Sequence, residues 1–294
     1  MEMLDRIKGG LMGVAIGDAM GGSTEFMNPE EIKHLYGRLM AIVGGGVWRL
    51  KPGEVTDDTE MTLCVARGIL ASPSDPIEKI GEEFIAWYNT NPKDIGLIIR
   101  SVIRNYKGDW FSAAEDLHLQ TGKTAGNGSL MRTLPVALAY ENRGKMEEIT
   151  RGQSLMTHFD PQATEACILY NRMAHRLLYG DPLEQVVQEE VKGTIYEENL
   201  GQKPDCPPDG YVVHTFHWVL YWLMNGRTFS GMITGAVNMG GDSDTIAAII
   251  GGLMGIHVGY AQIPAYLSDK ILLKEDLLQI AQQIYEIPMH GKVD

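Results

Sequence analysis

The spacing of apolar residues most strongly limits what this chain can fold into. Apolar side chains recur every three or four residues through almost the whole sequence, whereas alternating strand patterns bounded by turn residues are nearly absent. Segment 3–18 is an example, with Leu4, Ile7, Leu11 and Val14 on one side of a helix. The spacing therefore predicts an all-α fold.

No Ser/Gly-rich linker divides the chain, so we expect 1–294 to form a single compact many-helix domain. Longer non-helical sections are predicted at 37–52 and 193–208, and Pro73 and Gly226 fit helix ends. The further predicted helices are approximately 58–71, 76–90, 94–106, 128–140, 146–156, 161–179, 183–192, 210–225, 228–238, 244–259 and 270–286.

Glycine is unusually frequent in the first predicted helix. Gly9, Gly10, Gly13 and Gly17 would each weaken an isolated helix by about 1 kcal/mol relative to alanine. Such spacing makes sense where another helix crosses closely, so we expect a close helix partner for this segment.

Composition excludes several classes of protein. Hydrophobic residues make up 44% of the chain and charged residues 21%, which is typical of a globular protein. A net charge of −13 without a basic stretch argues against nucleic-acid binding. The three cysteines lack the spacing of a disulfide framework or zinc site. The longest apolar stretch, 247–261, is too short to cross a bilayer, so we expect a cytoplasmic protein without direct membrane insertion.

Two short segments far apart in the sequence each carry two aspartates and a threonine just before an apolar run. Carboxylates held this close repel each other, so they either stay solvated or gather around cations. Four aspartates with hydroxyl groups beside them suit a hard cation such as Mg²⁺ or Mn²⁺. If the fold brings the segments together, their charge suits two divalent ions. The residues are Thr56, Asp57, Asp58, Asp242, Asp244 and Thr245.

Helix capping is the alternative interpretation of both segments. Asp, Ser and Thr are preferred N-cap residues, and acids in a first helical turn face the helix dipole favourably. Asp57 with Glu60 resembles a capping box. A cap needs one such residue, however, and the second segment follows Gly240 and Gly241, which permit a tight turn. The repeated pattern favours a metal site.

Five sequence blocks follow one another in a fixed order along the chain. They are Gly17-Asp18-Ala19, Glu25-Phe26, Thr56-Asp57-Asp58-Thr59, Ala125-Gly126-Asn127-Gly128-Ser129-Leu130-Met131-Arg132 and Gly241-Asp242-Ser243-Asp244-Thr245. A single block would be a weak signal, but all five together are specific, and in this order they resemble the ADP-ribosylglycohydrolase family.

The resemblance implies an all-helical fold around a dinuclear metal centre and an enzyme that removes ADP-ribose from an arginine of a modified protein. The implied cofactors are two divalent cations, Mn²⁺ or Mg²⁺. The implied ligands, in which neutral threonine oxygens limit the excess of negative charge, are Thr56, Asp57, Asp58, Asp242, Asp244 and Thr245.

Two further acids match catalytic positions of the family. Glu25 matches an acid beside the metals that serves as a base for bound water or as a ligand, the alternative being a solvated loop acid. Asp94 matches an aspartate that acts on the ADP-ribosyl group. Its alternative role is the N-cap of the helix predicted to end at Tyr106.

Substrate-binding residues follow from the same resemblance. The glycine-bearing loop that enters a predicted helix suits a diphosphate, although alone it would more often be a simple turn. His158 is expected to line the substrate cleft, with a loop histidine as the alternative, and Tyr211 to stack on adenine, with a core tyrosine as the alternative. The loop residues are Gly126, Asn127, Gly128 and Ser129.

Within the family, Glu25-Phe26-Met27, residues 44–53 and Thr157-His158 most resemble bacterial members that act on the nitrogenase iron protein. The implied partners are that ADP-ribosylated iron protein and a P-II signalling protein. Any recruitment to the inner membrane would be indirect, and we expect a monomer.

Two other functions stay open. A dinuclear-metal phosphoesterase acting on a nucleotide would require Arg or Lys beside the ions, and only Arg132 is placed for this role. A non-catalytic ADP-ribose-binding regulator would not need Glu25 and the four intact aspartates. Release of ADP-ribose, of phosphate, or of neither distinguishes the three hypotheses.

Overall fold

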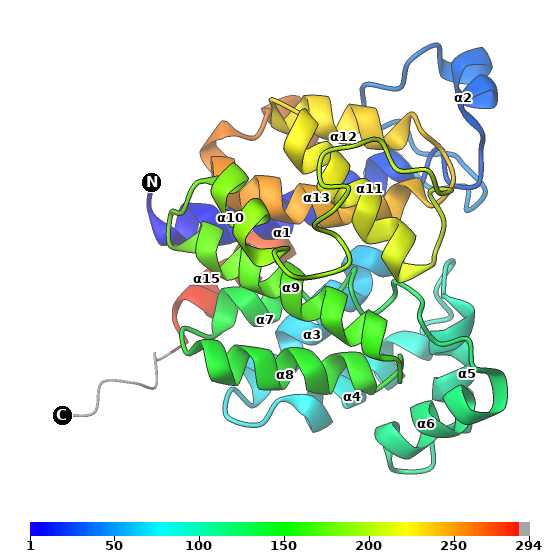
Figure 1. The fold of residues 1–294 in the computed structure, drawn as a ribbon, viewed down its shortest axis with the longest axis vertical. Helices are drawn as coiled ribbons and strands as arrows, with labels where there is room; N and C mark the ends of the chain where they lie inside the picture. The colour runs from blue at the N-terminus through cyan, green and yellow to red at the C-terminus, as the bar shows by residue number, and fades with distance from the viewer. Residues whose placement is uncertain (288–294) are drawn as a thin grey trace.

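The chain forms only helices and loops over residues 1–287, the part that the computed structural model describes. Figure 1 shows long helices packed around a central pair, α1 and α13. No β-strand occurs in the described range, which confirms the predicted all-α fold. The helices are α1 (Met3–Gly21), α2 (Pro29–Tyr36), α3 (Asp57–Ala71), α4 (Ile77–Tyr88), α5 (Leu97–Asn105), α6 (Trp110–Thr121), α7 (Leu134–Ala139), α8 (Arg143–Leu155), α9 (Pro161–Leu178), α10 (Leu183–Glu190), α11 (Val212–Asn225), α12 (Phe229–Val237), α13 (Ser243–Val258), the 3-10 helix η1 (Tyr260–Gln262), α14 (Ala265–Ser268) and α15 (Lys274–Tyr285).

Glycines allow α1 and α13 to lie in direct backbone contact. A Cβ atom built on Gly13 would lie 2.0 Å from the carbonyl oxygen of Gly251, and one on Gly9 would lie 2.1 Å from that of Gly255. Gly17 meets Ala247 in the same way, at 2.1 Å. The repeat of glycine every fourth residue of α1 thus forms a flat stripe against α13, and the predicted close helix crossing is confirmed.

The central pair is enclosed by other helices. Every residue from Gly9 to Gly21 and from Ser243 to Ile256 is buried. Helix α13 also contacts α3, α9, α11 and α12, and α15 packs along α1. A helix that is apolar on all sides fits this buried position.

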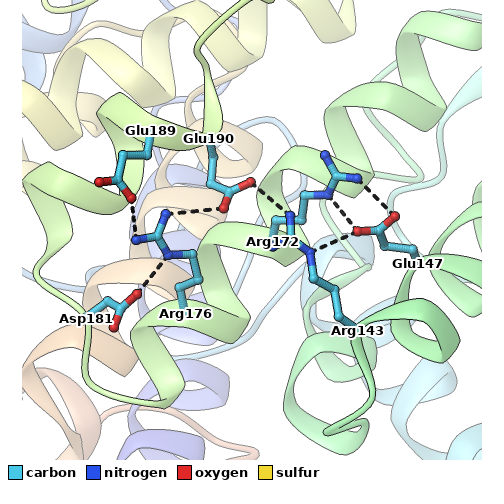
Figure 2. Close-up of polar contacts among 7 residues, drawn as sticks. All are labelled: Arg143, Glu147, Arg172, Arg176, Asp181, Glu189 and Glu190. Carbon is cyan, nitrogen blue, oxygen red and sulfur yellow. Dashed lines mark hydrogen bonds and ion pairs between the residues drawn. The ribbon is translucent and has the colours of Figure 1, made fainter.

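Ion pairs connect α8, α9 and α10 on the outside of the fold (Figure 2). Arg172 of α9 binds Glu147 of α8, with an Nε–Oε1 distance of 2.7 Å. One turn further along α9, Arg176 binds Glu189 and Glu190 at the end of α10, with N–O distances of 2.6 and 3.3 Å. Such partly exposed pairs contribute little stability each, and here they link the three helices side by side.

Four helices were not predicted, namely α2, α6, α14 and the 3-10 helix η1, and several predicted helix ends lie three or more residues from the observed ones. Helices α2 and α6 were not predicted, because each buries only one to three side chains and its apolar pattern is weak. The predicted helix 128–140 is shorter, since α7 begins only at Leu134. Residues 128–131 form turns instead, with the backbone N–H groups of Leu130 and Met131 bonded to the carbonyl of Asn127.

No helix in the described part of the chain combines the length and hydrophobicity needed to cross a membrane.

We expect Gly13→Ala to lower the free energy of unfolding by about 2–3 kcal/mol, because the added methyl group overlaps the backbone of α13. Urea denaturation measures the change. Gly144→Ala in α8 is the matched control, since a Cβ there meets only the Asn142 side chain, at 3.2 Å. The control should change stability by no more than about 1 kcal/mol, in the favourable direction. Equal stability of the two variants would contradict the close packing.

Candidate active site

The end of α1 and the start of α13 come together at one end of the central pair. A Cβ on Gly21 would lie 2.4 Å from the Cα of Asp244. The chain that follows α1 stays beside α13, because the N–H of Phe26 donates to the carbonyl of Gly241 at 2.7 Å and the N–H of Gly241 donates to that of Met27 at 2.9 Å. This backbone pairing places Glu25 next to the aspartates of α13.

Glu25, Asp242 and Asp244 form a carboxylate cluster that could hold a metal ion. Each offers an oxygen, and the three oxygens lie within 4.8 Å of one another. The indole N–H of Trp48 donates to Glu25, and the amide of Asn127 donates to Asp242, so neighbouring side chains orient both carboxylates. Ligands that are all oxygen suit a hard divalent cation.

The first acidic segment joins this cluster through α3. The hydroxyl of Thr245 donates to Asp58 Oδ2 at 3.3 Å, which links the two segments directly. The other oxygen of Asp58, Oδ1, is buried and has no hydrogen-bond partner among the described residues. Asp57 accepts only a long bond of 3.3 Å, from the N–H of Gly96. Buried carboxylate oxygens of this kind call for a further partner, and a cation fits the requirement.

Asp18 supports the cluster from behind, and sequence reasoning assigned it no role. Its buried carboxylate accepts the N–H of Thr56 at 2.9 Å and the hydroxyl of Thr56 at 2.8 Å. It also accepts the N–H of Thr59 at 3.0 Å and the hydroxyl of that residue. Since the Thr56 hydroxyl hydrogen points to Asp18, its oxygen lone pairs are free to face a cation. The sequence did contain a signal for this role of Asp18, namely an ionisable residue placed between a glycine and an alanine in a helix that is buried.

The capping interpretation of the acids is wrong. Thr56 and Asp242 occupy the N-cap positions of α3 and α13, yet neither side chain makes a capping hydrogen bond. Asp94 is not a cap either, because α5 begins at Leu97 with Gly96 as its N-cap. Asp57, Asp94, Asp242 and Asp244 instead line a common cleft, and Asp58 is joined to them through its bond with Thr245.

Burial of so many acids without basic partners strongly perturbs their protonation. Burial and mutual repulsion raise the pKa of Asp57, Asp58 and Asp244 well above the usual value. The same causes raise the pKa of Glu25 to about 8 and that of Asp94 to about 7. None of these acids forms an ion pair with a Lys, Arg or His among the described residues. A divalent cation would supply the missing positive charge.

A cleft of about 770 Å³ opens above the acids, a size within the range of small-molecule sites. Its floor carries acids from both segments, and one wall is the glycine loop Gly126–Gly128. This loop is fixed by backbone bonds to the segment before α11: Asn127 N–H donates to Gly210, and Val212 N–H donates to Ala125, both at 3.0 Å.

His158 lies against the glycine loop and belongs to the lining of the cleft. A Cβ on Gly126 or Gly128 would lie 3.3 or 3.2 Å from His158 Nε2, so glycine permits the close approach of the ring. On the other side, Arg132 donates to the Thr157 hydroxyl at 2.8 Å, and this hydroxyl lies 2.8 Å from His158 Nδ1. Burial and Arg132 lower the pKa of His158 well below its usual value, so the ring is neutral. The contacts favour a hydrogen on Nε2, the ring nitrogen that lies against Gly126 and Gly128.

Besides Thr56 and Asp58, three predicted residues do not line the cleft. The Ser129 hydroxyl is buried against Ser154 at 3.0 Å, and the Tyr211 hydroxyl donates to Gln162 at 2.8 Å. Arg132 is buried, with its guanidinium 4.4 Å from the centre of the Phe84 ring, and cannot clamp a phosphate in the cleft. Two cations that were not predicted, Arg100 and Lys123, do line the cleft.

Fold and site together define an all-helical protein whose cleft has a carboxylate floor that could hold a metal ion. The family model of ADP-ribosylglycohydrolase matches residues 1–292. The chain belongs to the ADP-ribosylglycohydrolase family.

Individual relatives agree with this assignment. The chain is 35% identical over 272 residues to the ADP-ribosyl-(dinitrogen reductase) glycohydrolase of Rhodospirillum rubrum, covering 92% of this chain and 91% of that protein. It is 30% identical over 304 residues to the ADP-ribosylarginine hydrolase Tri1 of Serratia proteamaculans, covering 97% and 80%. A solved structure described as an ADP-ribosylglycohydrolase-related protein complex matches with a TM-score of 0.81 and 29% identity, covering 97% and 98%.

We expect Mn²⁺ to raise the melting temperature of EDTA-treated protein, and to raise it more at pH 8 than at pH 6. Unfolded carboxyls have pKa values of about 4, so raised pKa values stabilise the cation-free fold at low pH. That stability is lost as pH rises through about 7 for Asp94 and about 8 for Glu25. A cation offsets the repulsion that then develops among the ionised acids.

Scanning fluorimetry checks the shift in melting temperature, which should shrink in Asp244→Asn and persist in the exposed-acid control Asp116→Asn. An equal shift at both pH values would contradict the expectation.

We expect ¹⁵N NMR at pH 7 to show a neutral His158 ring with its hydrogen on Nε2. Thr157→Val removes the hydroxyl beside Nδ1 and should abolish this preference, whereas Thr157→Ser should keep it. A hydrogen on Nδ1 in the unmodified protein would contradict the contact pattern.

Proposed function

We propose that this chain is a metal-dependent hydrolase that releases ADP-ribose from an arginine side chain of a modified protein. The observation that carries the proposal is the convergence of Glu25, Asp58, Asp242 and Asp244 from three distant parts of the chain below one cleft. Membership of the family and the names of the bacterial relatives, which act on ADP-ribosyl groups, support the same function.

The reaction adds water across the bond between ribose C1″ and a guanidinium nitrogen. That bond breaks, C1″ gains a hydroxyl group, and the arginine nitrogen gains a proton. Positive charge develops on the sugar, so carboxylates close to the ribose stabilise the transition state. Two divalent cations, when bound, would hold ribose hydroxyls and lower the pKa of bound water.

Each residue of the site has a proposed role in this reaction. Glu25 and Asp94, which both line the cleft, accept and return the proton of the attacking water and orient the reacting ribose. His158 and the backbone N–H groups of Gly126 and Gly128 bind the diphosphate. The proposed metal ligands are Thr56, Asp57, Asp58, Asp242, Asp244 and Thr245.

We further propose the nitrogenase iron protein as the modified substrate, and Mn²⁺ or Mg²⁺ as the cations. Support for the substrate comes from the Rhodospirillum rubrum relative, whose name specifies dinitrogen reductase. A P-II partner, a monomeric state and a cytoplasmic location stay predictions from the family resemblance.

A nucleotide phosphoesterase is less consistent with the site. Arg132, the cation expected to clamp a phosphate, is buried away from the cleft. Arg100 and Lys123 line the cleft, but neither forms an ion pair with the clustered acids among the described residues. A regulator that only binds ADP-ribose would have no need for a buried, mutually repelling set of acids.

We expect the protein to release ADP-ribose from ADP-ribosyl-arginine with Mn²⁺ and to stop when EDTA is added. Asp58→Asn should reduce kcat/KM by at least about 100-fold, since changes even beside metal ligands cost 10- to 100-fold. Asp116→Asn, at an exposed position, should retain full activity. Chromatography of the products measures the rate. Release of inorganic phosphate would instead support the phosphoesterase, and tight binding without turnover would support the regulator.

A further inference from the structure

Exposed apolar side chains gather at the mouth of the cleft. Phe26 and Leu97 line the cleft, yet 65% and 78% of their surfaces are exposed. Trp48 lines the same cleft, and its neighbour Val47 is 55% exposed. These four residues, here called the apolar rim, come from three separate segments of the chain. Single exposed apolar residues are common, but a group around one opening marks an interaction site.

Phe26 is held at this exposed position by its backbone. Its φ angle of 62° lies in the left-handed region, which a bulky residue rarely adopts. The bonds of Phe26 and Met27 with Gly241 keep the backbone in this conformation. The ring makes an edge contact with Trp48, with 6.4 Å between ring centres. A costly conformation that holds an aromatic ring in solvent is a feature of functional sites.

The position of the acids requires a protein substrate to contact the rim. The bond between ribose and guanidinium has to reach the carboxylates at the floor of the cleft. The arginine that carries the ADP-ribose therefore enters through the mouth, and the protein surface around this arginine lies against the residues at the opening. ADP-ribosyl-arginine alone has no such surface.

We propose that the apolar rim is the docking surface for the folded protein that carries the ADP-ribosyl-arginine, a partner with apolar groups around the modified arginine. The inference rests on the proposed function and extends it from the bond that is cleaved to the surface that is recognised. A rim of four side chains gives a small interface, which suits a substrate that has to leave after each turnover.

The test compares two substrates of the full-length protein with Mn²⁺: free ADP-ribosyl-arginine, and the folded iron protein modified on its arginine. In the variant Val47→Asp, at the rim residue that does not itself line the cleft, KM for the modified protein should rise about tenfold, which corresponds to about 1.4 kcal/mol of lost binding free energy. Both kcat and KM for free ADP-ribosyl-arginine should change less than about twofold. The matched control is Leu119→Asp, at an exposed leucine that does not line the cleft.

Each outcome decides between the proposals. A rise in KM for the protein substrate only, seen in the rim variant and not in the control, supports the docking surface. Equal KM values for the protein substrate in the rim variant and the unmodified enzyme overturn it, while turnover of ADP-ribosyl-arginine leaves the proposed function intact. If the unmodified enzyme cleaves neither substrate, the proposed function fails and the docking surface fails with it.

Discussion

The backbone contact between α1 and α13 is the constraint on which the rest of the structure depends. It joins the first helix of the chain to one of the last described helices, and it requires glycine or alanine at each crossing point, such as Gly13 and Gly251. Because the two helices lie so close, Glu25 beyond the end of α1 reaches the acids at the start of α13. The close packing of α1 against α13 in the core thus determines which acids meet at the cleft.

The same scaffold holds together groups that repel one another. Burial raises the pKa values of the clustered acids, and Asp18 anchors Thr56 and Thr59 behind them. A protein selected only for stability would not keep such a cluster. The conflict between local repulsion and global packing is typical of a binding site that is formed before its ligand arrives.

Much of this arrangement could be predicted from the sequence, and the exceptions have physical reasons. Long helices with continuous apolar patterns were predicted because burial on many sides leaves a strong periodic signal. The glycines of α1 indicated a close partner but not its identity, since Gly251 and Gly255 lie far away in the chain. Arg132 was expected beside the ions because it follows the glycine loop, whereas turns at 128–131 precede a side chain that is buried against Phe84. Side-chain direction after a turn cannot be read from spacing.

The pairing of α1 with α13 also has a consequence for biosynthesis. The ribosome makes α1 first, but the helix that covers its glycine stripe emerges only after more than two hundred further residues have been added. Closing so long a loop is entropically costly, and the stripe is uncovered until then. The nascent chain therefore completes its centre late, and a product terminated before α13 would lack the partner of α1 together with Asp242 and Asp244, two of the four aspartates proposed as metal ligands.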